Sequence, residues 1–179
     1  MKKPFVLAVI FLILLVFNLA CDQDTEDMDS AGSKVISISA TALKPGSSSY
    51  YDTWTFYTYP QEAYIVATAG VFTPIITAPV YLPHGAIVKG LVVYYTDNDD
   101  REDHQIRVGL IGHEMETGND HWMAAVISDV PASPDRRVLE DNTVDYAQVD
   151  NHKYAYFLEV TFHQPTADVK FHGAKIILE

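Results

Sequence analysis

The residues best suited to ligand chemistry are aromatic and crowd one short stretch of the chain. If this stretch is a β-strand, alternation places Trp54 and Phe56 on one face and Tyr51, Tyr57 and Tyr59 on the other. We expect Trp54 to lie in the core. A tyrosine ring has an apolar body and a polar tip, which suits stacking on a sugar or contact with a protein. The tyrosines therefore predict a ligand-binding face, and the alternative is that they cover a second layer of the core.

The densest run of acidic side chains offers the hard oxygen ligands that calcium prefers. Its candidate ligands are Asp97, Asp99 and Asp103. An EF-hand is excluded, because Glu102 stands where the loop needs Gly and Val108 stands where it needs Glu. We therefore predict no metal here and interpret the run as the solvated tip of a hairpin. A calcium loop of the kind found in β-sandwiches is the weaker alternative.

Histidines are numerous, but their spacing fits neither zinc nor catalysis. None belongs to an HExxH or HxH pattern, and no second cysteine could complete a structural zinc site. A GxSxG elbow is also absent, and an acidic chain brings carboxylates together by chance. We therefore predict no catalytic residue, no metal and no cofactor, with an envelope hydrolase as a further alternative. The histidines, most of them expected at the surface or at strand edges, are His84, His104, His113, His121, His152, His163 and His172.

The only cysteine, Cys21, follows a segment with the features of an export signal. Lys2 and Lys3 give it a positive start, and an apolar stretch runs from Phe5 to Leu19. This stretch is too short to span a membrane, which takes roughly 20 apolar residues. The segment therefore fits a cleaved signal peptide better than a transmembrane helix.

The end of this segment resembles the lipobox of bacterial prolipoproteins. Ala20 and Cys21 match that pattern, whereas Asn18 and Leu19 depart from its commonest form. The resemblance implies cleavage after residue 20 and lipid attachment at Cys21. It also implies a membrane-anchored protein of the bacterial cell envelope, facing the periplasm or the exterior. The alternative is a cleaved soluble protein whose lone thiol stands at the new N-terminus.

Three segments follow from this pattern: a signal peptide over 1–20, an acidic tether over 21–34 and a folded domain over 35–179. The tether is rich in Asp and Glu and has almost nothing to bury, which is typical of disordered chain. Losing Lys2 and Lys3 changes the net charge from −12 to −14. Such a charge repels nucleic acid at long range, so we exclude nucleic acid as a partner.

The folded part is predicted to be all-β, because its apolar residues alternate and no amphipathic helix of useful length appears. Many short strands joined by turn-rich segments indicate an antiparallel β-sandwich, most plausibly jelly-roll-like. A shift of apolar parity at Gly173 predicts a β-bulge in the last strand. The predicted strands are Val35–Ala40, Thr53–Tyr57, Tyr64–Ala69, Ile75–Val80, Ile87–Tyr95, Ile106–Leu110, Met123–Ser128, Val144–Val149, Tyr156–Phe162 and Val169–Leu178. The segment from Pro131 to Asp141 carries turn residues and is expected to be a loop at one end of the sandwich.

The segment Ala78–Leu91, together with Tyr94, Asp97 and Asp150-Asn151, resembles uncharacterised secreted bacterial β-sandwich proteins. That resemblance implies a fold and no activity. The sequence as a whole predicts a lipid-anchored, non-catalytic binding or assembly module of the cell envelope. Its partners would be the membrane, through the lipid, and a glycan or an envelope protein. A carbohydrate-binding β-sandwich that uses the aromatic face is the alternative.

Overall fold

The computed structural model describes residues 33–45, 54–67, 73–128 and 131–179, and Ser33–Glu179 forms one compact unit. A single 3₁₀ turn, Ala40–Ala42, interrupts an otherwise all-β chain in the described part. No helix among the described residues is long and apolar enough to cross a membrane. The strands are β1 (Lys34–Ser39), β2 (Lys44–Pro45), β3 (Trp54–Tyr59), β4 (Glu62–Ala67), β5 (Ile75–Val80), β6 (Val88–Asp97), β7 (Ile106–Glu114), β8 (Asp120–Ile127), β9 (Ser133–Asp141), β10 (Tyr154–Phe162) and β11 (Val169–Leu178).

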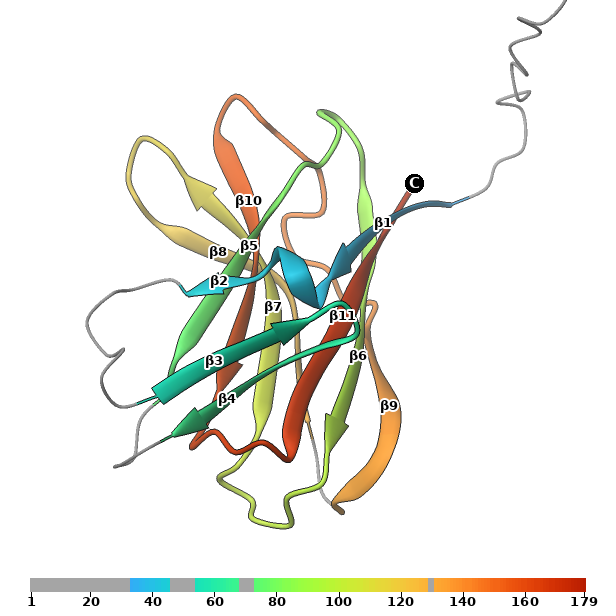
Figure 1. The fold of residues 1–179 in the computed structure, drawn as a ribbon. Coiled ribbons are helices and arrows are strands. Elements are labelled where there is room, and N and C mark those ends of the chain that lie inside the picture. The colour runs from blue at the N-terminus through green and yellow to red at the C-terminus, as the bar shows by residue number, and fades with distance from the viewer. Residues whose placement is uncertain (1–32, 46–53, 68–72, 129–130) are drawn as a thin grey trace, which may run out of the picture. The chain divides into compact units, whose positions relative to one another are not determined.

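These strands form two sheets, and within each sheet every pair of neighbouring strands is antiparallel. Sheet A has the order β3-β4-β11-β6-β9, with β1 also paired to β11. Sheet B has the order β2-β5-β10-β7-β8. Figure 1 shows the strands of sheet A in front of those of sheet B. The fold is therefore an antiparallel, jelly-roll-like β-sandwich, which confirms the predicted fold class.

The core fills the space between the two sheets, and the predicted alternation decides which side chains enter it. Ile106, Val108 and Leu110 of β7 are at most 1% exposed, and Leu158 and Val160 of β10 are fully buried. Their sequence neighbours point to the opposite side of sheet B. Each strand of this sheet therefore presents one apolar face inward and one chemically mixed face outward.

The predicted bulge in the last strand is confirmed at Gly173. The register of β11 against β6 shifts between Phe171 and Gly173. Gly173 has φ of 157°, and a Cβ added there would lie 2.9 Å from the carbonyl oxygen of Ile38 on β1. The close approach of β1 therefore requires glycine at this position.

Three expectations about the connections are wrong. Val144–Val149 is a turn whose only ladder contact is an isolated bridge from Ile87 to Gln148. The 131–141 segment instead contains a full strand, β9, at the edge of sheet A. The acidic run after β6 is not a hairpin tip, because β6 belongs to sheet A and β7 to sheet B. It crosses from one layer of the sandwich to the other.

Candidate functional site

Two of the three predicted ligand-binding tyrosines, Tyr57 and Tyr59, lie exposed on sheet A, where their rings stack on a third tyrosine. Tyr57 and Tyr59 are 37% and 50% exposed, whereas Phe56 packs against the core, as alternation predicts. Tyr64 of β4 stacks on both tyrosines, with ring centroids 5.0 Å from Tyr57 and 6.5 Å from Tyr59. The three rings therefore cover part of one another's faces. Tyr51 lies outside the described residues, and so does the side chain of Trp54.

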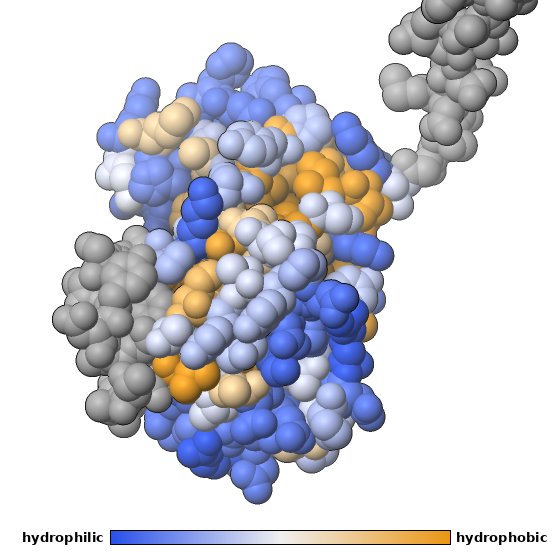
Figure 2. Space-filling view, in the orientation of Figure 1, coloured by the Kyte–Doolittle hydropathy of each residue, from blue (hydrophilic) through white to orange (hydrophobic). Residues whose placement is uncertain are grey.

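The opposite end of sheet A carries an apolar strip. Figure 2 shows apolar residues gathered over β1 and the C-terminal part of β11. Val35 of β1 is 45% exposed and pairs with Ile177 of β11. The next row on the same face pairs Ser37 of β1 with Lys175 of β11, and both are exposed.

The outer face of sheet B has a different composition, because aromatic and charged side chains share its centre. Across the sheet, Trp122, Ile111, Phe157 and Pro79 lie in one row by strand register. Ile111 is only 1% exposed although it points away from the core. Its burial shows that side chains on this face pack over one another and form a structured surface.

The indole ring of Trp122 lies flat on this face. A Cβ added at Gly109 of β7 would lie 2.1 Å from Cζ3 of Trp122, so only glycine leaves room for the ring. The guanidinium of Arg107 stacks over the same ring, with its Cζ 3.9 Å from the ring centroid. This cation–π contact holds the Arg107 side chain in one orientation, so little conformational entropy is lost when it donates to a ligand.

One hydrogen-bond donor of the stacked Arg107 side chain has no partner among the described residues. No described residue accepts a hydrogen bond from the buried Nε of Arg107. Glu159 of β10 lies on the same face, and burial raises the pKa of its carboxyl. A hydrogen bond from Oγ1 of Thr161, at 3.3 Å, and the positive charge of Arg107 act in the opposite direction. An unsatisfied buried donor beside a desolvated carboxyl is a typical sign of a binding site.

A groove of about 400 Å³ opens at one end of this face, where β5 and β10 separate. Tyr81, the residue after β5, is 86% exposed and lines the groove. Tyr154 and Asn151 line it from the other strand and its preceding loop. The side-chain Nδ2 of Asn151 donates to the carbonyl oxygen of Leu82 at 2.9 Å and joins the two loops.

The predicted calcium ligands have other partners. Asp97 is 3% exposed; its carboxylate accepts a hydrogen bond from Oγ of Ser128 at 2.5 Å and from the backbone N–H of Asp99 at 3.2 Å. Asp103 accepts a hydrogen bond from the side chain of Gln164. Within the described part of the chain, no three His, Cys, Asp or Glu side chains are grouped to hold a metal ion.

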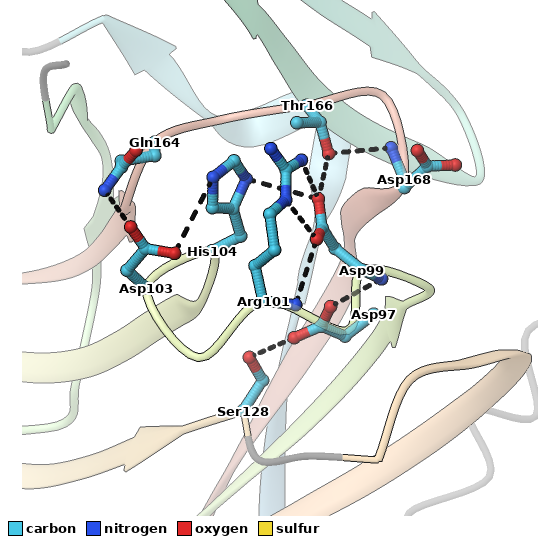
Figure 3. A network of polar contacts seen from close by, with 9 residues as sticks. All are labelled: Asp97, Asp99, Arg101, Asp103, His104, Ser128, Gln164, Thr166 and Asp168. Atoms are coloured by element: carbon cyan, nitrogen blue, oxygen red, sulfur yellow. Dashed lines mark hydrogen bonds and ion pairs between the residues drawn. The ribbon is translucent and has the colours of Figure 1, made fainter.

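Asp99 is the centre of this network, which Figure 3 shows. Nε and Nη2 of Arg101 donate to its two oxygens at 2.8 and 2.5 Å, and Oγ1 of Thr166 donates at 3.3 Å. Nδ1 of His104 lies 3.2 Å from Oδ2 of Asp99. The cation next to Asp99 is therefore the guanidinium of Arg101. The expectation of a solvated loop is wrong for Asp97, Asp99 and His104, since all three are buried.

The predicted site residues did not include Arg107, Trp122, Glu159 or Tyr81. A signal was available for Tyr81, which continues the outward parity of β5 after Pro79. No comparable signal existed for the other three, because they come from three different strands. Their proximity depends on the order of strands in sheet B.

Comparisons with known proteins agree with the sandwich. No family model matches the chain, and no curated protein sequence matches it. It is similar in structure to the N-terminal CBM22-1–GH10 modules of the Clostridium thermocellum endo-1,4-β-D-xylanase 10B, solved with xylohexaose. The identity is 12% and the TM-score 0.50, over 83% of this chain and 28% of that chain. This chain therefore spans little more than a quarter of that protein, and the likeness shows the fold alone.

Two solved domains of similar size also resemble this chain. One is the CBM22-2 xylan-binding domain of Paenibacillus barcinonensis Xyn10C, with 8% identity, a TM-score of 0.47, and coverage of 79% of this chain and 96% of that one. The other is the xylan-binding module CBM15, with 10% identity, a TM-score of 0.44, and coverage of 82% and 97%.

Proposed function

We propose that this protein is a non-catalytic carbohydrate-binding module that contacts glycans through the outer face of sheet B. The observation that carries the proposal is the Arg107 guanidinium, stacked on Trp122 with its Nε unpaired. Glu159 provides an acceptor on the same face. Sugars present many hydroxyl groups around an apolar ring, so they match fixed donors and acceptors among aromatic side chains. The CBM22-1–GH10 protein that this chain resembles was solved with xylohexaose, and this supports an oligosaccharide as the ligand class.

We further propose that Cys21 anchors the module to a membrane of the bacterial cell envelope. A tether between Cys21 and the start of β1 would hold the sandwich away from the lipid, because its acids repel anionic headgroups. A module held in this way would retain glycans, or an envelope protein that carries them, near the cell. The tyrosines of β3 and β4 remain the alternative glycan-binding surface.

The experiment compares binding of soluble oligosaccharides, including xylohexaose, to the wild-type domain and to Arg107→Lys. The substitution keeps the positive charge but removes the planar group that stacks on Trp122 and donates through Nε. We expect a loss of affinity of at least tenfold, measured by titration calorimetry. The matched control is Arg136→Lys on β9, an exposed arginine of sheet A. Equal binding by wild type and Arg107→Lys would refute the site, provided that both melt at the same temperature.

A catalytic role has its own readout. Incubation of the wild-type domain with the same oligosaccharides should release no shorter product. Release of product that is lost in Glu159→Gln would show that the domain is a hydrolase, because this carboxyl has the raised pKa that a general acid requires.

A further inference from the structure

On the outer face of sheet B, the outward residues of β5 and β10 form a strip that we call the lane. Its first two rows are the pairs Glu159–Thr77 and Phe157–Pro79. Tyr81 follows in the next row of β5, and the groove that it lines begins there. Tyr81 lies four residues beyond Thr77, a distance of about 13 Å along an extended strand. The lane is therefore longer than a single sugar ring.

Tyr81 is held rigidly at the end of this lane. Its neighbours Val80 and Leu82 are only 5% and 4% exposed, so the backbone on both sides is anchored in the core. Pro79 and Pro83 restrict the backbone further. The exposed ring therefore has only its own two side-chain torsions to order when a ligand stacks on it.

The groove beside Tyr81 is also built before any ligand arrives. Asn151 donates through Nδ2 to Leu82, and its backbone N–H donates to Nδ1 of His84 at 3.2 Å. These two bonds fix the amide, and Oδ1 accepts no hydrogen bond from a described residue. The groove thus combines an aromatic ring, Tyr81, with an oriented acceptor, Asn151. The opposite end of the lane has the same combination, with Trp122 as the aromatic ring and Glu159 as the acceptor.

We propose that the ligand is a linear oligosaccharide chain lying lengthwise along β5 and β10, with one end at Arg107 and Glu159 and the other against Tyr81. This inference rests on the proposed carbohydrate-binding function and extends it from a ligand class to a direction and a length. A single sugar would occupy only one end. A longer chain gains affinity from the second end, because the two contacts are then linked in one molecule.

The chemistry of the lane favours a neutral sugar chain over a peptide strand. β10 is paired with β5 on one side and β7 on the other, so its backbone N–H and C=O groups are already used. A peptide usually binds a sheet by adding a strand to it, and the paired backbone of β10 leaves no free edge for such a strand. The Arg107 and Glu159 charges are opposite, so the charged end favours neither an anionic nor a cationic polymer.

The test is a length series of one oligosaccharide, from the monosaccharide to xylohexaose, titrated into wild type, Tyr81→Ala and the control Val138→Ala. Val138 lies on β9 of sheet A, outside both candidate glycan-binding surfaces, and is 47% exposed. We expect wild-type affinity to rise with length, and Tyr81→Ala to lose about tenfold for the longest ligand and nothing for the shortest. Val138→Ala should match wild type throughout.

The outcomes separate this inference from the function on which it rests. If wild type binds no member of the series, the carbohydrate-binding proposal fails and the inference fails with it. If Arg107→Lys weakens binding but Tyr81→Ala equals wild type at every length, the site stands and the lane is refuted. An equal loss in Tyr81→Ala at every length, the monosaccharide included, would show a local site at Tyr81 and would also refute the lane.

Discussion

The network around Asp99 allows the sharpest prediction about stability. Its side chain is 5% exposed and accepts two hydrogen bonds from the Arg101 guanidinium. The side-chain hydrogen bonds from Arg101 hold the pKa of the Asp99 carboxyl at about 2, below its ordinary value of 3.8, although burial acts to raise it. A shift of this size corresponds to about 2 kcal/mol of folding free energy. We therefore expect Asp99→Asn to destabilise the domain by about 2 kcal/mol.

Urea unfolding measures this effect directly. With a slope of about 2 kcal/mol per molar urea, a loss of about 2 kcal/mol lowers the midpoint by about 1 M. Asp100→Asn is the matched control, because Asp100 is exposed in the same loop. The control should stay within about 0.5 kcal/mol of wild type.

The contribution of Asp99 to folding stability changes with pH in a definite direction. Because the pKa of Asp99 is lower in the folded state, its stabilising contribution is complete above pH 3.8 and is lost as pH falls toward 2. The difference between wild type and Asp99→Asn should therefore be large at neutral pH and small near pH 2. An Asp99→Asn variant as stable as wild type at pH 7, or a difference that persists unchanged near pH 2, would refute the reasoning.

Three further predictions follow from single residues. Cys21→Ser should remove the protein from the detergent phase, and a wild-type N-terminus without a diacylglycerol group would contradict the lipid anchor. Millimolar calcium should leave the melting temperature nearly unchanged, since Asp97 and Asp99 are already bonded within the protein; a rise of many degrees that Asp97→Ala abolishes would contradict this. Gly109→Ala should displace the Trp122 ring, change its fluorescence and weaken glycan binding, because the added Cβ would lie 2.1 Å from Cζ3; an unchanged spectrum would contradict the flat placement of the ring.

Alternation along the chain predicted most of the strands. From Ile106 to Leu110 in β7, and along the whole of β10, every second residue is apolar, and those residues pack in the core. The edge strand β9 was missed because it is rich in charged residues, among them the exposed Arg136 and the half-buried Arg137, and Leu139 is its only apolar residue that packs against the core. Val144–Val149 has a strand-like composition, but Tyr146 takes φ of 51°, which breaks an extended backbone.

The sequence by itself determined which residues face inward and which face outward, because that choice depends on the period of the strand and needs no partner. The sequence also located the β-bulge at Gly173, where the alternation of apolar residues shifts by one position. Only the tertiary structure decided which outward residues meet. Arg107, Trp122 and Glu159 are far apart along the chain and share one face because β7 lies between β8 and β10. Strand order and register come from pairing between distant segments, and no local pattern records them.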